Sequence, residues 1–107
     1  MWPRVIKSDE RREDYDREKL MLGVERACQK RPISTDAIER LVERVERRLV
    51  ESGDREIPSA WIGERTMEEL IAVDALAAVR FASVFMNFQR SEDYADFFDG
   101  LAKVDEP

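Results

Sequence analysis

Several basic side chains near the start of the sequence are spaced in a way that could bind an anion. Lys7 ends a short run of strand-forming residues, and Arg11 and Arg12 stand where the chain could return as a second strand. Asp16 can cap a following helix whose first turn contains Lys19. Cationic groups would then lie near a helix N-terminus, where a polyphosphate also meets free backbone amides. An ordinary solvent-exposed hairpin explains the same residues, so the pattern alone leaves both interpretations open.

Several residue types and motifs that enzymes commonly use for catalysis are absent from the sequence. The sequence has no histidine, which excludes a histidine base, a histidine triad and a histidine metal ligand. Its single cysteine, Cys28, has no base to activate it, and we expect it to be a small apolar residue at the end of the first helix. The four glycines are scattered and form no phosphate-binding loop. We therefore expect that the chain is not an enzyme.

The elements that would position these side chains follow from hydrophobic periodicity. We predict a mainly α, α+β fold in which a small N-terminal β-hairpin packs on a bundle of four to five helices. A single domain spans residues 1–107, with the hairpin at about 4–15, helices at about 16–102 and a frayed tail at 103–107. Residues 55–57 form a short extended piece, and Ser59 is the candidate cap of the helix that follows.

The apolar residues of three segments predict helices of the bundle. The second helix, capped by Ser34 or Thr35, has one apolar stripe and an opposite charged face, including Glu46, that we expect to be solvated. After a break near Asp74, residues 76–88 are apolar around most of the circumference, which indicates a central buried helix or an oligomer interface. A last helix after Ser91 has an aromatic stripe at Tyr94, Phe97, Phe98 and Leu101.

Charge and hydropathy indicate which ligands and which cellular compartment suit the protein. The net charge is −6, but residues 1–33 contain nine basic and seven acidic residues, so an anionic ligand should prefer this part. A general nucleic-acid surface is not expected, because such domains are usually basic. No apolar run is long enough for a membrane span or secretory signal, and the single cysteine fits a reducing compartment. We expect a cytoplasmic protein without membrane contact.

Four segments in order resemble the ATP-cone domain. The first, VIKSDERREDYDREKL (Val5 to Leu20), resembles its hairpin lid and first helix. RACQKRPIS (26–34) and REIPSAWIGERTMEEL (55–70) resemble its helix junctions. VRFASVFMNF (79–88) is similar to a signature of the bacterial transcriptional repressors of ribonucleotide reductase genes. The resemblance covers roughly residues 3–100.

The resemblance implies a nucleotide sensor that binds ATP or dATP, with Mg²⁺, and converts the choice of nucleotide into a change of homo-oligomeric state in control of ribonucleotide reductase expression. By motif position it assigns the base and phosphates to six residues: Val5, Lys7, Glu13, Lys19, Leu20 and Ser59. The repressors also contain a DNA-reading zinc ribbon, which one cysteine cannot form. We therefore expect no zinc in this chain and no specific DNA binding by this chain alone.

The chain departs from the family pattern at four positions. Ser8 replaces a basic residue, Glu10 the turn glycine, Ala78 a tyrosine and Met86 an arginine. Each change removes a possible ligand contact or adds repulsion, whereas the fold can tolerate all four. The alternative function is therefore a helical oligomerisation or protein-interaction module of ATP-cone fold, with weakened or lost nucleotide binding.

Overall fold

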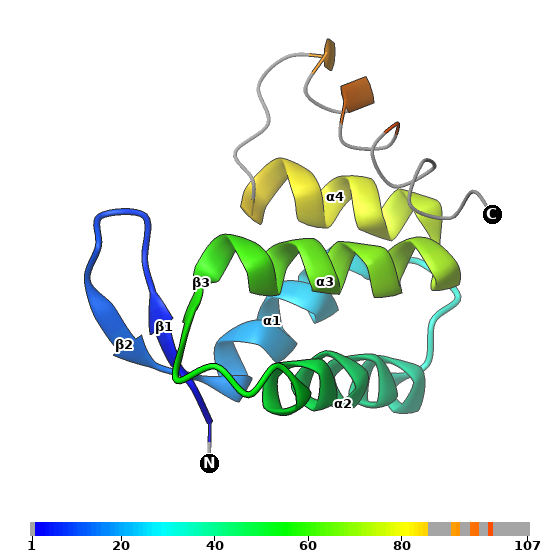
Figure 1. Cartoon of the computed structure of the whole chain (residues 1–107). Coiled ribbons are helices and arrows are strands. Elements are labelled where there is room, and N and C mark those ends of the chain that lie inside the picture. Colours follow the sequence, from blue (N-terminus) through cyan, green and yellow to red (C-terminus); the bar gives the residue numbers. More distant parts are fainter. Residues whose placement is uncertain (1, 86–90, 93–94, 97–98, 100–107) are drawn as a thin grey trace, which may run out of the picture.

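The computed structural model describes residues 2–85, 91–92, 95–96 and 99, and the first of these ranges contains four helices and a small three-stranded sheet (Figure 1). The predicted mainly α, α+β class is confirmed. The predicted stripe at Tyr94, Phe97, Phe98 and Leu101, the position of Met86 and the predicted tail at 103–107 all lie outside the described residues. The elements are β1 (Arg4–Ile6), β2 (Arg12–Asp14), α1 (Arg17–Ala27), α2 (Thr35–Glu51), β3 (Glu56–Pro58), α3 (Ser59–Val73) and α4 (Ala75–Phe85).

The predicted N-terminal hairpin is present. Strands β1 and β2 pair antiparallel with Val5 opposite Glu13, and the Lys7 amide donates to the Arg11 carbonyl at 2.8 Å. Glu10 adopts a φ of 69° in the turn, in the left-handed region that favours glycine. The pattern that the sequence resembles has glycine at this position, and this chain places a glutamate in a backbone conformation that glycine adopts more readily.

A parallel pairing between β1 and β3 joins the hairpin to the second half of the chain. Val5 lies opposite Ile57, and the Arg4 amide donates to the Arg55 carbonyl at 2.8 Å. The sequence predicted an extended piece at 55–57 but not its partner. Because β3 leads directly into α3, the pairing places Ser59 beside the hairpin. This direct connection also explains why Ser59 is the first helical residue rather than the cap, which is Pro58.

Two of the predicted caps are confirmed. The Asp16 side chain accepts from the Lys19 amide at 3.3 Å and begins α1, and the Ser34 hydroxyl accepts from the Ala37 amide at 3.0 Å and begins α2. Each cap satisfies one of the amides that a helix leaves without an internal partner. The apolar stripe of α2 is also confirmed, because all five of its members are buried: Ile38, Leu41, Val42, Val45 and Leu49.

The outer face of α2 is less solvated than predicted. Glu46 is only 6% exposed, because the Tyr15 hydroxyl donates to its carboxylate at 2.8 Å as the chain passes from β2 to α1. Arg44 and Arg48 of the same helix reach α3, where they pair with Glu69 at 3.2 Å and Glu68 at 2.9 Å. Tertiary contacts, rather than the helical charge pattern, decide which charged residues of α2 remain in water.

Helix α4 has an inner and an outer face. Ala77, Ala78, Phe81 and Ala82 are buried, whereas Val84 is 86% exposed. The prediction of a central helix buried on most of its circumference is therefore wrong for residues 75–85. The other interpretation, an interface with another chain, stays a prediction.

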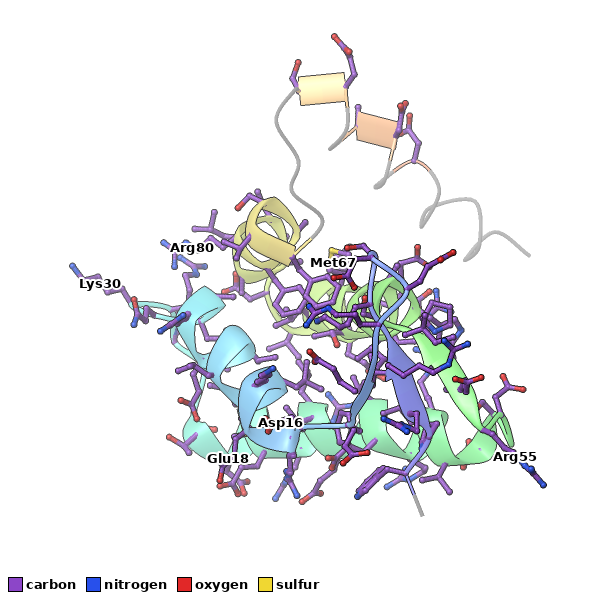
Figure 2. The ribbon with its side chains drawn as sticks, turned by 90° about the vertical axis from the view of Figure 1, so that its left-hand side faces the viewer. Asp16, Glu18, Lys30, Arg55, Met67 and Arg80 are labelled. Atoms are coloured by element: carbon purple, nitrogen blue, oxygen red, sulfur yellow. The ribbon has the colours of Figure 1, made fainter. Side chains whose placement is uncertain are left out.

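The junction between α3 and α4 is fastened to the end of α1. The Asp74 carboxylate accepts from the Ala77 amide at 3.0 Å and pairs with Arg31 at 2.8 Å. The Arg80 guanidinium donates to the Gln29 carbonyl at 2.6 Å and to the carbonyl of Ala27, the last residue of α1, at 3.5 Å, so this lone charge inside α4 caps the C-terminus of α1. Figure 2 shows Arg80 at the end of α1 that leads to Lys30, away from Asp16 at the other end.

We expect this junction to make the free energy of unfolding depend on pH. The Ala77 amide, and then the Arg31 side chain, lower the pKa of Asp74 from its ordinary 3.8. A carboxyl group with a lowered folded pKa contributes stability above its unfolded pKa, and that contribution is lost as pH falls through the folded value. In urea unfolding, Asp74→Asn should be less stable than wild type at neutral pH, and the difference should shrink below about pH 4. The exposed Asp54→Asn is the control, and a difference that does not change with pH would contradict the prediction.

Candidate functional site

A cavity lies where the hairpin, the first half of α1, the start of α3 and the end of α4 meet. It contains about 580 Å³ of empty space, part of it open to solvent. All six residues that the sequence analysis assigned to a ligand line it: Val5, Lys7, Glu13, Lys19, Leu20 and Ser59. They come from three separate segments of the chain, and the β1–β3 pairing brings the third segment to the first two.

The cavity also has lining residues that sequence reasoning did not assign to a ligand. Ile62, Phe81 and Phe85 supply apolar surface from α3 and α4. Phe81 and Phe85 stack on each other with ring centroids 5.2 Å apart. The one sign of this wall in the sequence is Gly63, a glycine within α3. An added Cβ at this position would lie 2.0 Å from the Phe85 ring, so any other residue would displace the ring. The remaining lining residues are Asp14, Tyr15, Asp16 and Gly23.

The charged groups of the cavity are arranged around Glu13. Its carboxylate lies 3.7 Å from the Lys19 ammonium group and 3.7 Å from the Arg11 guanidinium. The side chain of Lys19 is 70% exposed, and Lys7 is half-buried at the hairpin. Since the Asp16 carboxylate already accepts from the Lys19 amide, an anion entering here would depend on the two lysine side chains more than on that amide. The arrangement places two lysine cations beside an apolar wall.

The single cysteine and three of the four positions that depart from the ATP-cone pattern lie outside the described lining of the cavity. Cys28 is buried at the end of α1, and burial raises the pKa of its thiol, which keeps it in the protonated form. Ala78 is fully buried and is not among the lining residues, whereas Ser8 and Glu10 are exposed on the hairpin.

In the part of the chain that the structure describes, no three acidic or cysteine side chains are grouped to hold a metal ion, and no helix has the length and hydropathy to span a bilayer.

Comparison with known proteins identifies the family. The ATP cone domain family matches residues 3–91, which include every element described above. The chain belongs to the ATP-cone family. The resemblance that the sequence analysis drew from four segments is thereby confirmed over most of the chain, and the cavity lies within the matched range.

This ATP cone is homologous to proteins named transcriptional repressor NrdR. It is 48% identical to the one from Geotalea uraniireducens over 101 residues, which cover 94% of this chain and 67% of that protein. It is 50% identical over 102 residues to that of Geotalea daltonii and 44% identical over 106 residues to that of Myxococcus xanthus, covering 66% and 61% of them. The chain therefore spans about two thirds of the length of these relatives, which are repressors and not enzymes.

Proposed function

We propose that this ATP cone binds ATP or dATP in the cavity and couples the bound nucleotide to its homo-oligomeric state, in control of ribonucleotide reductase expression. The observation that carries the proposal is the convergence of the six assigned residues on one cavity. The pattern that picked them out concerns residue types along the sequence, whereas the cavity is a property of the fold.

The lining divides in the way a nucleotide requires. Lys7 and Lys19 supply positive charge for the phosphates, and the Ser59 hydroxyl can form a hydrogen bond. Val5 and Leu20 form, with the α3 and α4 side chains, an apolar wall for the base. Glu13 holds Lys19 at the cavity until phosphates replace its carboxylate. Mg²⁺ would enter bound to the phosphates and offset their charge beside Glu13.

A ligand-dependent rise in melting temperature tests the proposal. At a free nucleotide concentration one hundred times the dissociation constant, binding should add about 2.7 kcal/mol to the free energy of unfolding. We expect ATP and dATP with Mg²⁺ to raise the melting temperature, and inorganic tripolyphosphate with Mg²⁺ to raise it less because it has no base. An unchanged melting temperature with both nucleotides would favour the alternative, an interaction module that has lost nucleotide binding.

The proposed output is a change of assembly. Size-exclusion chromatography with ATP and then with dATP should give different elution volumes for the wild-type chain. With a net charge of −6 and without a zinc ribbon, the chain alone should not shift promoter DNA. Identical elution with both nucleotides would contradict the coupling without contradicting the binding.

A further inference from the structure

Glu46 is a buried carboxylate that lies outside the assigned site. It belongs to the middle of α2, is 6% exposed and is not among the residues that line the cavity. One of its oxygens accepts from the Tyr15 hydroxyl at 2.8 Å, and the other lies 3.7 Å from the Arg17 guanidinium. Burying a carboxylate is costly unless it is paired and hydrogen-bonded, and Glu46 has both kinds of partner.

The partners of Glu46 belong to the segment that forms one wall of the cavity. Residues 13–17, which we call the β2–α1 segment, contribute Glu13, Asp14, Tyr15 and Asp16 to the lining. Tyr15 is half-buried, and its ring also contacts the Trp2 ring at a centroid distance of 5.0 Å. The hydroxyl contact with Glu46 therefore ties this segment to α2, a helix that itself contributes nothing to the cavity lining.

We propose that Glu46 is a positioning residue for the cavity: through the Tyr15 hydroxyl it holds the β2–α1 segment where a bound nucleotide needs it. The proposal rests on the proposed function for the identity of the ligand. Burial, and then the hydrogen bond to Glu46, raise the pKa of Tyr15, so its hydroxyl remains a donor at physiological pH. Tyr15 stands between Asp14, the last residue of β2, and Asp16, the cap of α1, so its hydroxyl contact acts on the point where the two elements join.

The sign of the effect distinguishes this role from simple electrostatics. Removing a carboxylate should strengthen the binding of an anionic nucleotide if only charge matters. If Glu46 acts by holding the segment, Glu46→Ala should instead weaken binding, and Tyr15→Phe should do the same without any change of charge. Glu46→Gln keeps an oxygen that can accept from the Tyr15 hydroxyl, so it should remain close to wild type. Glu43→Ala, an exposed acid on the same helix, is the matched control.

The first measurement needs no nucleotide. Hydrogen exchange of the whole chain should show faster exchange across residues 13–17 in Tyr15→Phe and Glu46→Ala, by about five- to tenfold for the loss of one hydrogen bond. The amides of α3 should be unchanged, and Glu43→Ala should match wild type. Unchanged exchange in both test variants would overturn the proposal.

The second measurement is the dissociation constant for dATP with Mg²⁺ by titration calorimetry. We expect it to rise about five- to tenfold in Tyr15→Phe and Glu46→Ala and to stay near wild type in Glu46→Gln and Glu43→Ala. Tighter binding by Glu46→Ala, or unchanged affinity despite faster exchange, would overturn the positioning role. If the wild-type chain binds neither nucleotide, the proposed function fails, and the exchange measurement still decides whether Glu46 holds the segment.

Discussion

Replacing Lys19 with alanine is expected to weaken dATP binding about ten- to hundredfold, because a hydrogen bond to a charged group contributes about 1.5–3 kcal/mol. Lys7→Ala should have an effect of the same order. Both lysines line the cavity, one from the hairpin and one from the first turn of α1, so they can reach one polyphosphate from two sides. Titration calorimetry with Mg²⁺ present measures both variants.

A matched control separates loss of the site from loss of charge. Arg47→Ala removes one positive charge from an exposed position on α2, away from the cavity lining, and should leave the dissociation constant within about twofold because such charges are largely screened. The Lys19→Ala chain should also unfold at nearly the wild-type temperature, since its ammonium group is largely exposed. Wild-type affinity in both lysine variants would refute the assignment of the phosphates to this cavity.

Leu41→Ala is expected to destabilise the domain by about 2–5 kcal/mol, the usual cost of truncating a fully buried leucine. Leu41 is 1% exposed and lies in the centre of the α2 stripe, among the side chains that form the core. A domain of this size has about 5–15 kcal/mol of stability, so this loss is a large fraction of the total. Urea unfolding measures the change through the shift of the midpoint.

The control for this prediction is another leucine on a helix. Leu22 is 46% exposed on α1, and Leu22→Ala should cost less than about 1 kcal/mol because nearly half of the residue's surface already contacts water. Equal losses in the two variants would mean that the stripe of α2 is not the centre of the core.

Periodicity and capping were enough to predict the helices and the hairpin, because these depend on residues close in sequence. The α2 stripe and the Asp16 and Ser34 caps follow directly from spacing and side-chain chemistry. What local patterns could not predict is where distant segments meet. The β1–β3 pairing joins residues about fifty positions apart, and the burial of Glu46 depends on Tyr15 passing over α2.

The residues of the candidate site also divide into those that a local motif predicts and those that only the packing of distant segments reveals. A motif of basic residues and a family resemblance pointed to Val5, Lys7 and Lys19, whereas Ile62, Phe81 and Phe85 are ordinary apolar helix residues in the sequence. Only the packing of α4 against both α1 and α3 turns them into a wall. Ser59 was assigned by motif position, but it reaches the cavity because β3 ends beside the hairpin.

The central place of β1 in the sheet means that the lysine-bearing motif is not a portable unit. Grafting residues 4–20 onto another scaffold would transfer every cation of the motif, but it would leave behind β3, Ser59 and the two stacked phenylalanines. The graft would contain the charged residues but not the cavity that they line. The proposed nucleotide site therefore needs residues from both halves of the chain, and we expect that a fragment containing only one half would not bind nucleotide.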